Sequence, residues 1–523
     1  MTEMRTGGTA QAAETDALIL PVFAGEAGLV GDAADINAAL GGLLHDVMMS
    51  RGWKAGVGST LVVPTAGYMR QLANMGTTSG VPGQIGQTAA LSGGIAAREV
   101  VLVGLGRREA YGPNAARRAY GAGARAARDA GARTVAAALP PTTDGANGVN
   151  GANGGAQAAT EGMLLSLYQF AKYHTLDTPA KAVDHLTFVG ADAGQVADGV
   201  RLGEAVAYGV MVARDLATEP GNALVPIDLA AAARQIATEN GLSYVEYDVD
   251  AMGAMGAGAL LAVGQGSVNP PRLVHLTYEP EGGYTRTVAI VGKGITFDTG
   301  GISLKPGQNM DAMKHDMGGA ATTLGVMAAV AQVAPKVRVF GIIAAAENMP
   351  SGTAFRPGDV LTAMNGKTIE VISTDAEGRL VLADALVYAA RHGADAMIDL
   401  ATLTGGAVVA LGNITTAVFT NDDALCDEFL HAAAFEGEKA WRMPLDAEYR
   451  DQIKSDIADL KNSGGREASA ITAAKFLEEF TEGKPWVHLD IAGTVWDKKG
   501  GPFTPRGATG VHVRSLLRML AEA

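Results

Sequence analysis

Four acidic residues lie in short glycine-rich segments beside apolar stretches of the sequence. Asp298 lies in ITFDTGG, Asp316 in KHDMGG, and both Asp375 and Glu377 in STDAEGR. A carboxylate in such a setting is costly unless it is paired or bound to a metal, and four together repel one another. Two divalent cations would cancel these four charges. Because residues two apart share a face of an extended chain, Asp375 and Glu377 can converge on one centre.

This set of residue types favours hydrolysis at a two-metal site. Oxygen ligands without cysteine or an obvious histidine suit hard or borderline cations. Two cations about 3.5–4 Å apart can share a water molecule and ionise it near neutral pH. Such a site needs no serine or cysteine nucleophile. Arg379 follows Glu377 at the same two-residue spacing and would place a positive charge beside the metals, where an anionic group would lie.

Each of these features has a simpler interpretation when it is taken alone. Asp316 would be the N-cap of a helix that begins near residue 320. Glu377 and Arg379 would form a surface ion pair that contributes little to stability. Lys293 and Lys305 would be solvated, as most lysines are. Only the combination of all these residues favours a functional site.

The elements that would position these residues alternate between strands and helices. We expect helices at residues 320–333 and 380–392 of the second half. The predicted strands of that half are the apolar runs 287–291, 337–344, 368–372, 396–400, 417–420 and 486–491. In the first half, strands are predicted at 17–23, 99–105 and 185–189, with a helix at about 114–132. This alternation predicts the α/β class, in which sites lie at the ends of strands.

Three segments are predicted along the chain. Residues 1–190 form an N-terminal α/β domain, residues 191–215 a linker helix, and residues 216–523 a catalytic domain. Residues 140–158 are rich in glycine and asparagine and have little to bury, so we expect a flexible surface loop there.

The composition excludes several classes of protein. The net charge of −14 disfavours non-specific binding to nucleic acid or to anionic membranes. No apolar run approaches about 18 residues, so neither secretion nor membrane spanning is indicated. The single cysteine, Cys426, rules out an internal disulfide and fits a reducing compartment. We therefore expect a cytoplasmic protein without a membrane partner.

Several motifs of the second half, taken together, resemble the leucyl aminopeptidase family of two-metal exopeptidases. The most specific is the eight-residue signature STDAEGRL at Ser373–Leu380. The other motifs occur in the family's order: Gly292–Pro306, Met313–Ala321, Ala346–Gly352, Asp399–Gly405, His488–Gly493 and Gly507–Gly510. The resemblance implies a macro-domain-like N-terminal sheet domain and a catalytic domain with a central mixed sheet flanked by helices.

The resemblance also implies a set of metal ligands. Two divalent metal ions per subunit, Mn²⁺ or Zn²⁺, are expected. Lys293, as a neutral amine, and Asp316 would bind one metal, Asp298 and Glu377 would bridge both, and Asp375 would bind the second. Lysine is an unusual ligand because it must lose its proton, which two adjacent dications would favour.

Two further residues would act in the reaction by the same resemblance. Lys305 would polarise the scissile carbonyl and stabilise the oxyanion. Arg379 would hold a bicarbonate ion that acts as general base towards the metal-bound water. Since the substrate's free α-amino group would bind a metal, only a chain end would be cleaved.

Specificity and assembly are implied in the same way. Met313, Thr402, Gly405 and Ala492 would line the pocket for the first side chain, and Leu403 would contact the substrate backbone. The pocket is apolar, so peptides beginning with Leu, Met and similar residues are the expected substrates. The family's members are hexamers, and a homohexamer is expected here.

Two other function classes are compatible with part of the pattern. A two-metal phosphoesterase would have a similar oxygen-rich site, but the lysine ligand and the absence of histidine ligands disfavour it. A nucleic-acid-binding or assembly role is disfavoured by the net charge and by the complete set of expected catalytic residues.

Overall fold

A computed structural model describes residues 2–26, 28–65, 95–140, 151–176, 181–190 and 193–523. The chain divides into two compact units. The first comprises Met1–Ala207 together with Gly500–Pro505, and the second comprises Tyr208–Lys499 together with Arg506–Ala523. The division falls within the long helix α6, Ala193–Thr218.

The first unit is built on a six-stranded sheet with the order β1-β6-β5-β2-β4-β3. Its strands are β1 (Glu3–Thr6), β2 (Ala17–Phe23), β3 (Thr60–Pro64), β4 (Glu99–Gly106), β5 (Thr134–Ala138) and β6 (His185–Val189). Neighbours are parallel except for the antiparallel pair β3–β4. Every residue of β2 is buried, because the sheet is covered on both faces.

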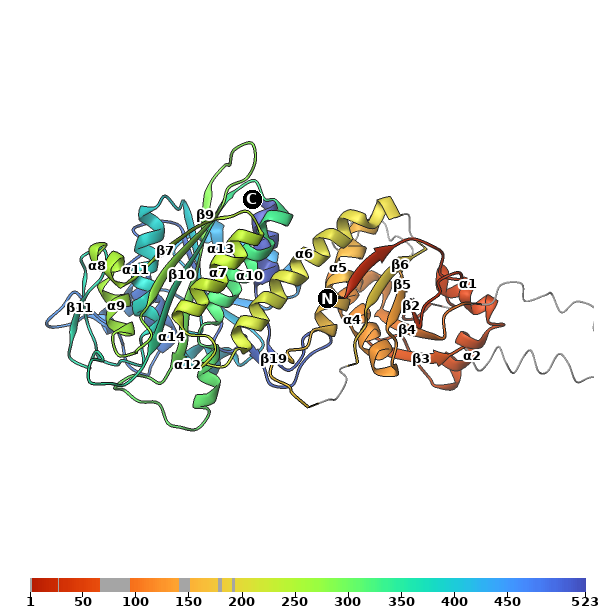
Figure 1. The fold of residues 1–523 in the computed structure, drawn as a ribbon, viewed down its shortest axis with the longest axis horizontal. Coiled ribbons are helices and arrows are strands. Elements are labelled where there is room, and N and C mark those ends of the chain that lie inside the picture. The colour runs from red at the N-terminus through yellow and green to blue at the C-terminus, as the bar shows by residue number, and fades with distance from the viewer. Residues whose placement is uncertain (1, 27, 66–94, 141–150, 177–180, 191–192) are drawn as a thin grey trace, which may run out of the picture. The chain divides into compact units, whose positions relative to one another are not determined.

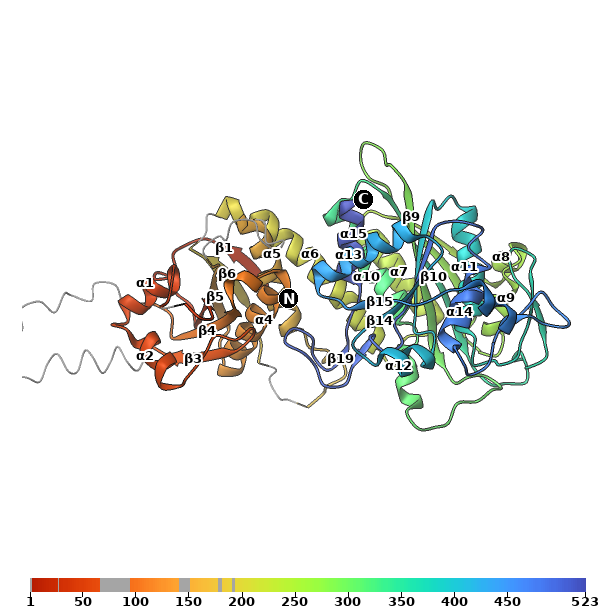
Figure 2. The same cartoon turned by 180° about the vertical axis from the view of Figure 1, so that it is seen from behind.

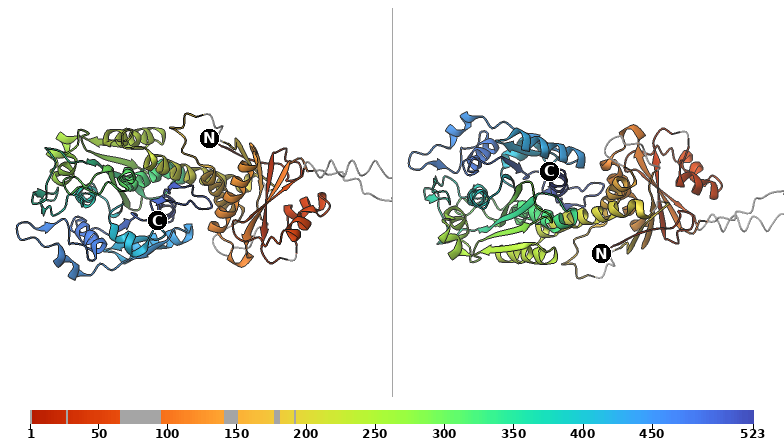
Figure 3. Two further views of the ribbon diagram at one scale, coloured as in Figure 1. Left: turned by 90° about the horizontal axis from the view of Figure 1, so that it is seen from below. Right: turned by 90° about the horizontal axis from the view of Figure 1, so that it is seen from above.

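Helices flank this sheet on both sides, as Figure 3 shows. They are α1 (Asp32–Ala39), α2 (Leu43–Ser50), α4 (Pro113–Ala130) and α5 (Gly151–Leu167). Alternate residues of β2 enter different cores: Ile19 packs with residues of α4 and α5, and Leu18 and Leu20 pack with residues of α1 and α2.

The prediction of a loop over 140–158 is wrong for residues 151–158, which form the first turns of α5. Small side chains explain the difference. Ala156 and Ala158 are 0% and 1% exposed, and both belong to the hydrophobic core that α4 and α5 form with the sheet. Small residues let two helices approach closely, so a segment that looks poor in apolar bulk still buries its surface. Residues 141–150 of the predicted loop lie outside the described residues.

The second unit contains an eight-stranded mixed sheet with the order β15-β14-β17-β13-β9-β10-β8-β7. Its strands are β7 (Ser243–Tyr247), β8 (Arg272–Tyr278), β9 (Thr287–Asp298), β10 (Arg338–Asn348), β13 (Ala396–Ala401), β14 (Thr416–Thr420), β15 (Ala440–Arg442) and β17 (Trp486–Asp490). The four central strands β17, β13, β9 and β10 are parallel. The predicted fold class, two α/β domains with sheets flanked by helices, is therefore confirmed.

The central strands end together at one edge of this sheet. Asn348 at the end of β10 is paired in register with Asp298 at the end of β9. Ala401 at the end of β13 is paired with Asp490 at the end of β17. In an open α/β sheet the crevice beyond the carboxyl ends of parallel strands is the usual place for a ligand. The candidate site lies at this edge.

Helices cover both faces of the second sheet (Figure 1). Helices α9 (Gly258–Gly264), α11 (Gly378–Arg391) and α14 (Ser469–Glu478) pack on one face. Helices α7 (Pro226–Glu239), α10 (Gly318–Val333), α13 (Asp423–Glu436) and α15 (Val513–Glu522) lie on the other. Figure 2 shows α13 and α15, which pack against each other.

The smaller elements complete the second unit. A three-stranded sheet joins β11 (Val360–Thr362), β12 (Thr368–Glu370) and β16 (Leu460–Lys461). A two-stranded ribbon joins β18 (Trp496–Asp497) and β19 (Gly507–Ala508). The short helices are α8 (Val249–Ala254), α12 (Gly405–Leu411), η3 (Met310–His315) and η4 (Ala447–Ile453). Across the described parts of the chain, none of the helices has the length and apolar character to span a membrane.

Candidate active site

The ammonium group of Lys293 lies between two carboxylates. Lys293 is on β9, and its Nζ is 2.7 Å from Asp316 Oδ2 and 2.8 Å from Glu377 Oε1. It also donates a 3.1 Å hydrogen bond to the carbonyl oxygen of Thr402. All three charged side chains are almost completely buried. A buried cation thus joins the segment before α10 to the segment before α11.

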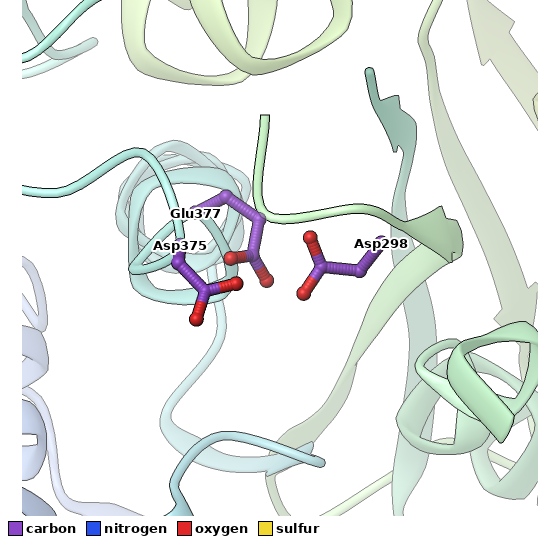
Figure 4. A group of neighbouring side chains, drawn as sticks. All are labelled: Asp298, Asp375 and Glu377. Carbon is purple, nitrogen blue, oxygen red and sulfur yellow. The ribbon is translucent and has the colours of Figure 1, made fainter. Parts of the chain in front are cut away.

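A second ammonium group has the same kind of surroundings. Lys305 Nζ is 2.7 Å from Asp298 Oδ2 and also contacts Asp375 Oδ1. The carboxylates of Asp298, Asp375 and Glu377 point towards one another, as Figure 4 shows. One oxygen from each lies within 4.8 Å of the others. The four predicted acids and both predicted lysines therefore meet at one place.

Burial and mutual repulsion shift the pKa values of these acids. Burial raises the pKa of Asp298 to about 6, helped by repulsion from Glu377. Burial raises the pKa of Asp316 to about 8, although Lys293 opposes the shift. Burial would raise the pKa of Glu377, but the charges of Lys293 and Lys305 lower it. Burial would also lower the pKa of Lys293, yet Asp316 and Glu377 raise it above its usual value.

The simpler interpretations of these residues are wrong. Helix α10 has Met317 at its N-cap without a side-chain hydrogen bond, and the Asp316 carboxylate instead accepts a 2.7 Å bond from Thr402 Oγ1. Glu377 and Arg379 are 2% and 7% exposed, so they are not a surface pair.

Arg379 lies in the first turn of α11 with part of its guanidinium unused. Its Nη1 donates a 2.8 Å bond to the carbonyl oxygen of Asn462. Its Nε is buried and has no hydrogen-bond partner among the described residues. Burial lowers the pKa of Arg379 to about 10, so the side chain stays charged at neutral pH. A buried cationic N–H of this kind fits an anion.

The predicted substrate-binding residues lie on segments around this cluster. Thr402 and Leu403 directly follow β13, and Gly405 is the exposed first residue of α12. Ala492 lies two residues beyond β17, and Met313 is a half-buried residue of η3. Thr402 contacts both Lys293 and Asp316 directly. Contact of all five residues with a substrate remains a prediction.

Sequence analysis did not identify three buried residues that hold this site together. Asp490 Oδ1 accepts bonds of 3.2 Å from the backbone nitrogens of both Leu403 and Ala492. Asn348 Nδ2 donates 2.8 Å to Asp298 Oδ1 and 3.0 Å to the carbonyl oxygen of Thr374. The third buried residue is Asn462, whose backbone carbonyl oxygen accepts the hydrogen bond from Arg379 Nη1.

The motifs gave a partial signal for two of these residues. Asp490 and Asn348 lie in the segments HLDIAG and AENMPSG, which carry the family resemblance. No motif singled out Asn462.

The donor set fits two small divalent cations. Lys293 and Lys305 already place a positive charge between two carboxylates each. The four carboxylates outnumber the two ammonium groups, and the raised pKa values of Asp298 and Asp316 reflect this shortage of positive charge, which further cations would relieve. Carboxylate oxygens are also the donors that hard and borderline divalent ions prefer.

Comparison with protein families gives two matches on this chain. The model described as "Cytosol aminopeptidase family, catalytic domain" matches residues 211–517. The model described as "Cytosol aminopeptidase family, N-terminal domain" matches residues 63–176. The first match includes every residue of the site described above.

Curated relatives are similar over most of the chain. A probable cytosol aminopeptidase of Alkaliphilus metalliredigens is 40% identical over 512 residues, which is 96% of each chain. One from Solibacter usitatus is 46% identical over 432 residues, covering 82% of this chain and 88% of the relative.

Solved structures agree with these relatives in fold. The bottromycin maturation enzyme BotP in complex with Mn has a TM-score of 0.81 and 35% identity, covering 97% of this chain and 99% of its own. A mutant of tomato leucine aminopeptidase has a TM-score of 0.85 and 32% identity, covering 100% of this chain and 97% of its own. The chain therefore belongs to the cytosol aminopeptidase family of metallo-aminopeptidases.

Proposed function

We propose that this enzyme removes N-terminal amino acids, with a preference for Leu and similar apolar residues, from short peptides at a centre of two divalent cations. The observation that supports it best is the pair of buried ammonium groups, each held between two carboxylates, at the carboxyl edge of four parallel strands. This arrangement concentrates negative charge where the fold class places its ligands.

Five residues would hold the cations, which are Mn²⁺ or Zn²⁺. Lys293 and Asp316 would bind one ion, and Asp375 would bind the other. Asp298 and Glu377 would bind both ions. The bound pair would activate a water molecule for attack on a peptide carbonyl. Lys293 would have to give up its proton on metal binding, so metal affinity should rise with pH.

Two cationic side chains would act on the substrate. Lys305 has a side chain that is 22% exposed, against 3% for Lys293, so it can turn from Asp298 and Asp375 towards a bound peptide. There its ammonium group would donate to the carbonyl oxygen and stabilise the negative charge that develops on it. Arg379, through its unused Nε, would hold a bicarbonate ion that accepts the proton of the attacking water.

The substrate would lie against the segments that follow β13 and β17. Met313, Thr402, Gly405 and Ala492 would line the pocket of the first side chain, and Leu403 would contact the peptide backbone. The set offers mainly methyl, methylene and backbone surface, which suits an apolar side chain.

We further propose a homohexamer in the cytoplasm. Exposed apolar side chains of the second unit support the assembly: Val409, Ile414 and Trp441 are 89%, 65% and 64% exposed. Trp441 lies on β15, at an edge of the large sheet. Edge strands and large exposed apolar groups are usually covered by another subunit or partner in the functional assembly of a protein. The cytoplasmic location rests on the names of the relatives.

One comparison of substrates tests the proposal. The purified enzyme is assayed with Leu-p-nitroanilide and with p-nitrophenyl phosphate, in the presence of Mn²⁺ or Zn²⁺. Metal-dependent release of p-nitroaniline, with no hydrolysis of the phosphate, is expected. Cleavage of the phosphate alone would show a phosphoesterase and overturn the proposal.

A further inference from the structure

Asn462 is a fully buried residue beside the segment that carries two of the proposed metal ligands. It directly follows β16, which pairs in parallel with β12. Its backbone nitrogen donates a 2.9 Å bond to the carbonyl oxygen of Glu370, the last residue of β12. Residues 371–377 then run without helix or strand to the start of α11 at Gly378.

The side-chain amide of Asn462 makes four hydrogen bonds to the backbone of this connecting segment. Its Oδ1 accepts from the nitrogens of Ile372 at 2.8 Å and Ser373 at 3.3 Å. Its Nδ2 donates to the carbonyl oxygens of Ser373 at 2.7 Å and Ala376 at 3.3 Å. Two acceptor sites and two N–H groups are the full capacity of an amide, so the side chain is saturated.

The same residue also holds the proposed anion-binding arginine. The backbone carbonyl oxygen of Asn462 accepts the 2.8 Å bond from Arg379 Nη1. The buried Nε of the same guanidinium has no partner among the described residues. Asn462 thus contacts the backbone on both sides of Asp375 and the guanidinium two residues beyond Glu377.

The segment needs such a support for a physical reason. The carboxylates of Asp375 and Glu377 belong to the same close cluster, so their negative charges repel each other. Residues 372–376 belong to no strand or helix, so no regular element fixes the positions of their backbone groups. One saturated amide satisfies four of them and fixes the local backbone.

We propose that Asn462 is a positioning residue for the metal-binding and anion-binding groups. By fixing the segment from Ile372 to Ala376, it holds the Asp375 and Glu377 carboxylates in a metal-binding arrangement. By accepting from Arg379 Nη1, it fixes the position of the guanidinium, whose charge interacts with Glu377. This inference rests on the proposed two-metal function and adds to it a residue that touches neither metal nor substrate.

Asn462→Asp is the sharpest test, because it keeps the shape and replaces two N–H donors by an oxygen that faces two carbonyl oxygens. Asn421→Asp is the control for the loss of an amide that bridges backbone groups, made at an exposed position. Asn421 also bridges backbone groups, since it donates 3.0 Å to the carbonyl oxygen of Lys484 and accepts 2.8 Å from the nitrogen of Trp486. It lies at the opposite end of β17 from the site. Asn462→Ser is the second variant, used if the aspartate variant does not fold.

Mn²⁺ binding by equilibrium dialysis, with mass-spectrometric metal counting, is measured on the full-length wild type and variants. The Asn462 variants are expected to bind Mn²⁺ about 10–100-fold more weakly, as loss of a residue that supports metal ligands does. At saturating Mn²⁺, kcat for Leu-p-nitroanilide should stay at least about tenfold lower, with KM changing less, because Arg379 is also displaced. Asn421→Asp should match the wild type in both measurements.

The outcomes separate this inference from the function on which it rests. If a folded Asn462 variant keeps Mn²⁺ affinity and kcat within about twofold of an active wild type, the positioning role is wrong. If the wild type itself binds no Mn²⁺ and cleaves no aminoacyl substrate, the proposed function has failed instead. Equal loss in the Asn421 variant would also overturn the inference, because the effect would then be one of general destabilisation.

Discussion

Two lysines with similar partners occupy different depths in the candidate site. Lys293 is fixed on β9 among Asp316, Glu377 and the carbonyl oxygen of Thr402. Lys305 lies in the segment after β9 and retains more exposure. A buried, fully surrounded amine suits a metal ligand, whereas a more exposed ammonium can reach a substrate. The difference in surroundings supports different roles for two chemically identical groups.

Lys305→Ala tests this division of roles. We expect kcat for Leu-p-nitroanilide to fall about 10²–10³-fold, because a donor to the developing oxyanion is lost. Mn²⁺ binding should not weaken, since removing the ammonium group beside Asp298 and Asp375 leaves these carboxylates more negative. Steady-state kinetics and metal counting on the same samples measure both effects. Unchanged kcat would show that Lys305 does not act on the substrate.

At this scale, the sequence could predict the charged residues but not their supports. Asp298, Asp316, Asp375 and Glu377 were identified because acids in glycine-rich segments beside apolar strands are unusual. Asn462 looks like any loop asparagine in the sequence. Its role depends on the pairing of β16 with β12, a contact between segments about 90 residues apart.

At the scale of elements, the start of α11 lies directly against the buried lysine. Gly378 is the first residue of this helix, and a Cβ added there would lie 2.7 Å from Lys293 Nζ. The helix can approach β9 this closely only because a glycine is present. The helix start thus brings Glu377 and Arg379 to the end of the central strands.

Gly378→Ala should therefore displace Lys293 and weaken metal binding. We expect at least about a tenfold rise in the dissociation constant for Mn²⁺, since ligand geometry is sensitive to shifts of this size. Equilibrium dialysis measures it. Gly307→Ala is the control, because a Cβ there meets nothing within 4 Å. Equal Mn²⁺ affinity in both variants would argue against close packing of α11 on Lys293.

A buried histidine on one of the outer strands of the large sheet predicts an effect of pH on stability that does not involve the metals. His275 on β8 is buried, and burial lowers its pKa to about 4. Its Nδ1 lies 2.9 Å from the hydroxyl of Tyr388 on α11, and its ring contacts Phe340. Below pH 6.5 the unfolded chain binds a proton that the folded chain does not. Stability should therefore fall as the pH drops from 6.5 to 4, by up to about 3 kcal/mol.

Substituting His275→Gln should remove this contribution. Urea unfolding of the wild type and the variant at pH 6.5, 5.5 and 4.5 gives the comparison. We expect the wild type to lose more stability than the variant across this range, because only the wild type gains the extra proton on unfolding. Parallel loss in the two proteins would show that His275 is not the group responsible.

The elements themselves followed largely from the sequence where apolar periodicity was strong. The central strands β9, β10, β13 and β17 overlap the apolar runs that predicted them. The start of α5 did not follow, because its alanines and glycines carry little apolar signal of their own. Their burial depends on the facing helix α4, which the local sequence does not reveal.

At the scale of the whole molecule, assembly gives a direct prediction. The chain has a mass of 53.4 kDa. Light scattering on the protein as it elutes from a size-exclusion column should give a mass of about six times this value. Trp441→Glu should reduce the mass, because a charge on the exposed edge strand disfavours burial against another subunit. A wild-type mass equal to one chain would contradict the hexamer.

Metal content measured together with activity tests the central claim most directly. The enzyme is stripped with a chelator, titrated with Mn²⁺, and assayed with Leu-p-nitroanilide while bound Mn²⁺ is counted by mass spectrometry. The proposed centre predicts no cleavage in the stripped enzyme and full activity at two Mn²⁺ per chain. Full activity without bound metal, or no aminopeptidase activity at two bound Mn²⁺ per chain, would contradict it.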